Sequence, residues 1–312
     1  MPPPSCVLSS SISSCGTAID SAQVMRWTPG DRSNVDDERG RSGMRIGGVP
    51  IGIGGFLILL LLSWLTGMPI TQLLNSGGSD SGSVGTSGRV ATSPTEERQV
   101  DFVDAMMKDI QDSWHARLSQ YEPTRAVLFR DAIQSTCGFA QSATGPFYCP
   151  QDGKVYLDLG FFDELQSRFG ASGEFARAYV LAHEVGHHIQ RLTGVEQRVR
   201  SAQRAQPGAV NAMSVRLELQ ADCYAGVWGH VAAQPGRAAH GQVELEPGDA
   251  EDGLRAAAAI GDDRLQRMST GHVAPDRFTH GTSAQRVEWF RRGLSGGDPA
   301  ACDTFAAARG TR

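Results

Sequence analysis

The chain has 312 residues, of which 40% are hydrophobic and 20% are charged. This is a globular composition, with enough apolar residues for the core of one large domain or two ordinary ones. Lysine and arginine number 29 against 34 acidic residues, which gives a formal net charge of −5. No basic run is long enough to follow a phosphate backbone, so we do not expect nucleic acid as a partner.

The apolar stretch Ile46–Leu65 has 20 uncharged residues, about what a helix needs to cross roughly 30 Å of hydrocarbon. Because Pro50 and several glycines weaken the helix pattern, a shorter buried or signal-type segment is the alternative. No Ala-x-Ala cleavage site follows, so an uncleaved single-pass anchor is expected. Five arginines precede the stretch: Arg26, Arg32, Arg39, Arg41 and Arg45. The positive-inside rule then places residues 1–45 in the cytoplasm and the rest of the chain outside the inner membrane.

Residues 66–92 are rich in glycine and serine, a composition that cannot bury a core and is typical of a flexible tether. Helix signals begin directly afterwards. Ser93 is placed to cap a helix, with Glu96 as the return arm of a capping box, and apolar residues then recur every three or four positions. We therefore place the folded domain at residues 93–312.

The cysteines are divided by the apolar stretch, because two precede it and four follow it. An even number facing an oxidising compartment suggests two disulfides, and the hypothesis is that Cys137 pairs with Cys149 and Cys223 with Cys302. Buried free thiols are the alternative. The absence of a Cys-x-x-Cys motif from the sequence excludes a thiolate zinc ribbon.

The run "FYCPQDGKVYLDL" predicts a β-hairpin that turns at Asp152-Gly153. Val155 and Leu157 alternate with more polar residues, so one face of the second strand is expected to be half-buried. Next to a metal-binding helix, such a strand could be the edge along which an extended peptide pairs. An ordinary hairpin with no binding role is the alternative. Together with helical patterns elsewhere, the hairpin indicates a mostly helical α+β domain.

The segment "YVLAHEVGHHIQ" contains His183 and His187, which are one turn apart on a helix and project on the same side. Both imidazoles can therefore reach one metal ion at about 2 Å. Glu184 lies beside the first ligand and is placed as the base for a water that the metal activates. The pattern also occurs by chance in about 1% of chains of this composition, so it needs a third ligand to support it.

The segment "VRLELQADCYAGVW" supplies that ligand. Glu218 follows His187 by 31 residues, and Asp222 lies one helical turn further on. Glu218 would bind the metal, and Asp222 could accept the free ring N–H of a ligand histidine. A charged helix face is the alternative for both acids. His188 faces about 100° away from His187 and is expected to support a ligand or the fold.

The chain resembles a bacterial, membrane-anchored family of zinc enzymes, the "putative neutral zinc metallopeptidase" family, from Met25 to Phe305. The segments that carry the resemblance include "GPFYCP", "KVYLDLGFFDEL", "AYVLAHEVGHHIQ", "VRLELQADCYAGVW" and "FTHGTSAQRVEWF". The resemblance implies a zincin-like fold of the thermolysin, or gluzincin, type. It also implies a Zn²⁺ ion bound by His183, His187 and Glu218, as the spacing argument suggests.

The same resemblance implies hydrolysis of a peptide or protein substrate, with Glu184 taking a proton from water and returning it to the leaving amine. A histidine from a downstream segment contacts the oxyanion in thermolysin-type enzymes, and His280 in "RFTHGTS" is the candidate; capping or packing is its alternative role. The rival function is a non-catalytic, zinc-stabilised module that binds envelope proteins through the hairpin edge. The sequence sets neither the physiological substrate nor an oligomeric state.

Overall fold

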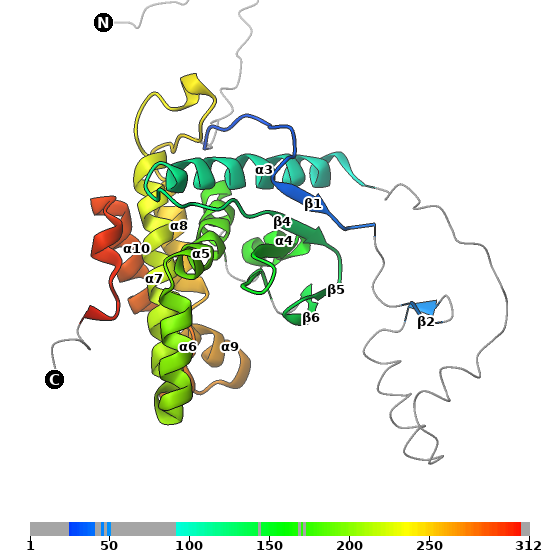
Figure 1. Ribbon diagram of the computed structural model, residues 1–312. Coiled ribbons are helices and arrows are strands. Elements are labelled where there is room, and N and C mark those ends of the chain that lie inside the picture. The colour runs from blue at the N-terminus through cyan, green and yellow to red at the C-terminus, as the bar shows by residue number, and fades with distance from the viewer. Residues whose placement is uncertain are drawn as a thin grey trace, which may run out of the picture.

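The computed structural model describes residues 25–40, 45–46, 49–50, 92–142, 145–167, 170 and 173–306, and these form an α+β fold (Figure 1). The α-helices are α3 (Pro94–His115), α4 (Gly160–Ser167), α5 (Glu174–Leu192), α6 (Val195–Ala205), α7 (Val210–Ala232), α8 (Asp249–Ala259), α9 (Asp262–Thr270) and α10 (Ser283–Gly296). Short 3-10 turns are η2 (Pro207–Ala209), η3 (Ala238–His240), η4 (Pro275–Arg277) and η5 (Pro299–Cys302). The strands are β1 (Val35–Asp37), β2 (Arg45–Ile46), β3 (Val49–Pro50), β4 (Ala126–Phe129), β5 (Ala132–Ser135), β6 (Gly138–Gln141), β7 (Phe147–Cys149) and β8 (Lys154–Asp158).

The main sheet has four strands in the order β1-β4-β8-β7. Strand β4 pairs parallel with both β1 and β8, whereas β7 and β8 form the antiparallel hairpin that the sequence predicted. Gly153 in its turn has a φ of 70°, a conformation that glycine adopts without strain. The hairpin is therefore confirmed, and β7 is an edge strand within the described part of the chain.

Strand β8 is buried on both faces, more deeply than its alternation predicted. Val155 and Leu157 pack into the main core with residues of α3 and α5. On the other face, Tyr156 joins a smaller cluster with Phe147 and with Ile133 of β5. The second face is buried by residues of β5 and β7, and β4 pairs along the strand. The contacts with β4 and β5 are non-local, so the alternation within β8 cannot predict them.

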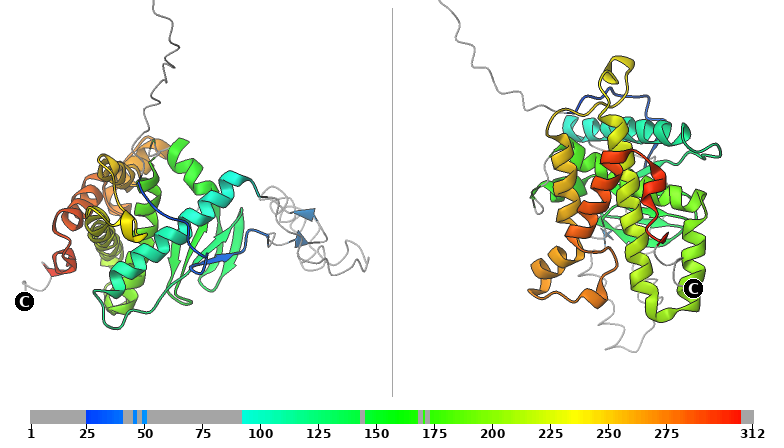
Figure 2. Two further views of the ribbon diagram at one scale, coloured as in Figure 1. Left: turned by 90° about the horizontal axis from the view of Figure 1, so that it is seen from above. Right: turned by 90° about the vertical axis from the view of Figure 1, so that its left-hand side faces the viewer.

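Helices α5, α7, α8 and α10 form a second layer, while α3 crosses the sheet (Figure 2). The α7–α10 crossing is close because both helices contribute a glycine to it. A Cβ at Gly293 would lie 2.0 Å from the Cys223 carbonyl oxygen, and one at Gly226 would lie 2.1 Å from the Phe290 carbonyl oxygen. No side chain fits at either position without a shift of the backbone, and the close approach packs α10 directly against α7.

Both disulfides of the hypothesis are present. Cys137–Cys149 joins the turn between β5 and β6 to the edge strand β7, and Cys223–Cys302 joins α7 to η5. Ser93 also caps α3 as predicted, because its side chain accepts a hydrogen bond from the Glu96 N–H. The Glu96 carboxylate, however, binds Arg130.

The start of the domain requires a correction. The sequence placed it at Ser93, but residues 25–39 also belong to the domain, since β1 is part of the main sheet. The expected helix does not begin at Ile46, because β2 and β3 form a short antiparallel ladder there. Residues 51–65 of the expected anchor, and the linker up to residue 91, lie outside the described residues. Among the helices that are described, none combines the length and apolar character needed to cross a membrane.

Candidate metal centre

Three side chains from two facing helices meet at the centre of the domain. His183 and His187 come from α5, and Glu218 comes from α7. His183 Nε2 lies 3.2 Å from Glu218 Oε2, and His187 Nε2 lies 3.5 Å from Glu218 Oε1. The structure thus brings together the three residues that the sequence proposed as ligands, with donor atoms that all lie within 4.8 Å of one another.

The spacing of these donor atoms suits a zinc ion. Bonds of about 2.0–2.1 Å in a tetrahedral site place neighbouring donors about 3.3 Å apart. The separations of 3.2 and 3.5 Å, one to each oxygen of Glu218, lie on either side of that value. Two imidazole nitrogens and one carboxylate are also a donor set of catalytic zinc sites, in which a fourth position stays open. The residues present therefore fit the ion.

A glycine between the two histidines allows the helices to approach. A Cβ at Gly186 would lie 3.0 Å from the Cα of Ala221 and 3.1 Å from its carbonyl oxygen, so Gly186 packs directly against the α7 backbone. Glu218 lies one turn before Ala221 on α7. The close crossing is consequently what lets a short glutamate side chain reach both histidines.

Asp222 supports His183 from the buried side. Its Oδ1 lies 2.8 Å from His183 Nδ1 and accepts a hydrogen bond of 2.5 Å from the Tyr179 hydroxyl. Arg286 of α10 donates to both oxygens at 2.9 Å. With Nδ1–H directed at the carboxylate, Nε2 of His183 is left for a metal ion.

His187 is held in a different way. Its Nδ1 donates to the Gln190 side-chain oxygen at 2.9 Å, and the Gln190 amide donates to the Leu217 carbonyl at 2.7 Å. Gln190 therefore connects His187 to the turn of α7 that carries Glu218. As with His183, the hydrogen bond at Nδ1 leaves Nε2 on the side of the carboxylate.

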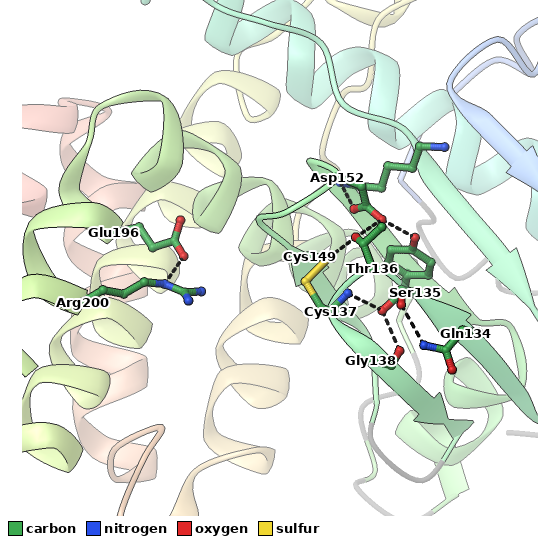
Figure 3. The surroundings of a disulfide bond; sticks show 11 residues. Gln134, Ser135, Thr136, Cys137, Gly138, Cys149, Asp152, Glu196 and Arg200 are labelled. Atoms are coloured by element: carbon green, nitrogen blue, oxygen red, sulfur yellow. Dashed lines mark hydrogen bonds and ion pairs between the residues drawn. A yellow bond between two sulfur atoms is a disulfide. The ribbon is translucent and has the colours of Figure 1, made fainter. Parts of the chain in front are cut away.

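A cleft of about 770 Å³ opens in front of the three residues, and Glu184 and His280 both line it. Glu184 is 7% exposed, and among the described residues none donates a hydrogen bond to its carboxylate. One side of the cleft is formed by β7 and the other includes Glu196 and Arg200, an ion pair with a separation of 2.6 Å. Figure 3 shows this pair on α6, opposite the β7 disulfide.

His280 reaches the cleft from the loop before α10. Its Nδ1 lies 3.1 Å from Asp262 Oδ1, while Asp262 Oδ2 accepts hydrogen bonds from the backbone N–H groups of Thr279, His280 and Gly281. The side chain of His280 is half exposed. The structure therefore places this residue at the cleft and gives it a carboxylate partner.

His188 has the structural role that its direction on the helix predicted. Burial lowers its pKa, so the ring is neutral. Nε2–H then donates to the Glu122 carbonyl at 2.6 Å, and Nδ1 accepts from the Tyr148 hydroxyl at 2.9 Å. Because Tyr148 belongs to β7, His188 fixes the edge strand against α5.

Comparison with known proteins identifies the family. The family described as "Putative neutral zinc metallopeptidase" matches residues 25–305. The chain belongs to this family. Relatives include uncharacterized protein YpfJ of Escherichia coli K12, 45% identical over 303 residues that cover 90% of this chain and 99% of YpfJ. Uncharacterized protein Rv2575 of Mycobacterium tuberculosis H37Rv is 48% identical over 199 residues, 62% of this chain and 67% of Rv2575. No solved structure matches the chain.

The charges around His183, His187 and Glu218 favour a cation between these three residues. Burial opposes ionisation of Glu218, but His187 and His183 outweigh it and hold its pKa well below the usual range. Burial likewise opposes protonation of His183, yet Asp222 and Glu218 raise its pKa to about 10. Two carboxylates thus attract positive charge to His183, and a metal ion would supply that charge in place of the proton.

Four supporting residues were missed by the sequence analysis: Tyr179, Gln190, Asp262 and Arg286. The first two had a detectable signal, because Tyr179 lies one turn before His183 and Gln190 one turn after His187 on the same helix. The other two lie on α9 and α10, and only the packing of those helices reveals their partners.

Proposed function

We propose that this domain is a zinc-dependent peptidase in which His183, His187 and Glu218 hold the ion. The observation that carries the proposal is the placement of Glu184. A carboxylate without a hydrogen-bond donor among the described residues lines the cleft directly beside the three ligand candidates. A zinc ion that only stabilises the fold has no use for such a group, so this placement favours a peptidase over the non-catalytic binding module.

The chemistry follows from the positions of the side chains. Zinc, when bound, polarises the scissile carbonyl and lowers the pKa of water to about 7. Glu184 accepts a proton from the attacking water and passes it to the leaving nitrogen as the carbon–nitrogen bond breaks. His280 donates a hydrogen bond to the oxygen on which negative charge develops. Asp222 and Gln190 keep the two ligand imidazoles oriented.

A peptide substrate suits the geometry of the cleft. Strand β7 lines it and is an edge strand within the described residues, so its free backbone groups are available to an extended chain. Phe147 and Tyr148 offer apolar surface beside this edge. His188 and the Cys137–Cys149 disulfide hold the strand in place, which supports a preformed binding edge.

We also propose that the domain acts outside the cytoplasm, attached to the inner membrane through the stretch Ile46–Leu65. The two disulfides support the oxidising compartment, because such bonds persist there and are rare in the cytosol. The length and apolar character of the stretch support the membrane as partner.

The test combines metal analysis with cleavage of a peptide library by the purified full chain. Glu184→Gln should retain about one zinc per chain and lose hydrolysis, because ligands and base have separate tasks. Glu251→Gln is a matched control, since Glu251 is exposed on α8. Cleavage of peptides at the parent rate by the Glu184→Gln variant would show that Glu184 is not the base.

A further inference from the structure

Residues 25–39, which precede the apolar stretch, are built into the domain that follows it. Strand β1 pairs with β4 in the main sheet (Figure 1). Met25 is 3% exposed in the main core, and the Arg26 N–H donates to the Glu244 carbonyl at 2.9 Å. The Trp27 ring packs edge-on against Phe102 with centroids 5.5 Å apart. These contacts are those of an integral part of the fold.

A buried acid on α3 depends on this segment. Asp104 is fully buried, and its hydrogen bonds from the described residues come from the backbone N–H of Arg32 at 3.0 Å and from Asn34. The Asn34 backbone N–H donates at 2.9 Å and its side-chain amide at 3.1 Å. A carboxylate that is buried without hydrogen-bond donors strongly destabilises a fold. The domain therefore needs residues 25–39 beside α3 in order to fold stably.

Three of the five arginines that indicated a cytoplasmic N-terminus have partners in the domain. Arg32 pairs with Glu97 and Asp101 of α3, each at 2.7 Å. Arg39, whose side chain is 2% exposed, lies 2.9 Å from Glu97. Arg26 pairs with Glu246 and Glu244. Their positive charge is balanced by acidic side chains of the domain, so it is a weak guide to membrane orientation.

The described residues on either side of the apolar stretch consequently meet at nearly one point of the domain. Arg39 stands before residues 40–92 and Glu97 just after them, and their side chains are in contact. A segment that starts and finishes on the same body crosses a membrane an even number of times or not at all. The 20 apolar residues of Ile46–Leu65 suffice for one helical crossing, whereas two crossings need about 40.

We propose that residues 25–39 lie on the same side of the membrane as the candidate metal centre. The stretch Ile46–Leu65 then attaches the protein to the bilayer from that side alone. This arrangement replaces the single-pass topology expected from the sequence. It does not rest on the proposed peptidase activity, because it follows from the packing of β1, Asp104 and the arginines.

Labelling of one introduced cysteine at a time in intact spheroplasts tests the proposal, with the four native cysteines left in their two disulfides. Cys6 and Cys15 are changed to serine in the full chain, and either Thr28→Cys or Ser269→Cys is introduced, both at exposed positions. A membrane-impermeant maleimide is applied before and after permeabilisation. Both positions should react to about the same extent before permeabilisation, or both should require it, because they belong to one body.

A difference between the two positions would overturn the proposal. In the single-pass topology, position 269 reacts in intact spheroplasts and position 28 reacts only after permeabilisation. Labelling of both variants in detergent provides the control for intrinsic reactivity, and both should react there at similar rates. Since no hydrolysis is measured, an inactive enzyme would leave the outcome unaffected.

Discussion

Two groups of residues at the cleft differ in how deeply their charged side chains are buried. The ligand wall, formed by α5, α7 and α10, contains Asp222 and Arg286, which are 0% and 2% exposed. The loop before α10, called the loop wall here, also lines the cleft and carries His280, whose side chain is half exposed. On the ligand wall, charges out of water must be paired, so the site and the stability of the fold depend on the same contacts. On the loop wall, a functional group can be removed at little cost to folding.

The largest effect should follow from Arg286→Ala. The variant removes the arginine that pairs with both oxygens of the buried Asp222 carboxylate and leaves His183 and Tyr179 as its partners. Breaking a buried ion pair in this way costs roughly 3–5 kcal/mol. Urea denaturation should therefore show a free energy of unfolding lower by that amount. Arg292→Ala, on the exposed side of the same helix, should change it by less than about 1 kcal/mol. Equal stability of the two variants would mean that the ligand wall does not depend on the buried pair.

His280→Ala examines the loop wall. If the proposed contact exists mainly in the transition state, kcat should fall by about 10²-fold or more. Zinc content and the free energy of unfolding should stay close to those of the parent, because the side chain is half exposed. A kcat within about threefold of the parent, or about 0.7 kcal/mol, would assign His280 to structure.

The contrast between the walls also explains what the sequence could predict. His183, Glu184 and His187 share one helix, and Glu218 and Asp222 share another, so spacing alone proposed their relation. The hairpin likewise had a local turn signal. The Asp222–Arg286 pair joins residues 64 positions apart, and no local pattern reports which helix packs on which.

The N-terminal segment shows the same limit. Strand β1 has three residues, too few for a periodic pattern, and it pairs with a strand about 90 positions later. The apolar stretch between the two strands led to the prediction that the residues before it and after it lie on opposite sides of the membrane. Only the partners of Asp104 and Arg39 reveal that both flanks belong to one body.

A smaller effect is expected from Gly186→Ala on the ligand wall. The new Cβ would lie 3.0 Å from the Cα of Ala221, which is backbone and cannot move aside easily. Overpacking of this kind costs typically about 1–3 kcal/mol, and a wider α5–α7 crossing would draw Glu218 away from the histidines. Competition with a chelator should show weaker zinc binding. Gly208→Ala, with no atom within 4 Å of its Cβ, should bind zinc like the parent.

The smallest effect concerns the pH dependence of activity. The hydrogen bond to Asp262 is the largest cause that raises the pKa of His280, with Glu218 adding to it while burial and Arg286 oppose it. A raised pKa keeps the His280 imidazolium, a strong hydrogen-bond donor, present to higher pH. Activity that needs this protonated form declines as the pH rises through that pKa.

Asp262→Asn removes the negative charge beside His280 and should move the basic limb of the kcat/KM profile to lower pH. A basic limb at the parent position in this variant, with zinc content preserved, would show that His280 does not act as the protonated donor.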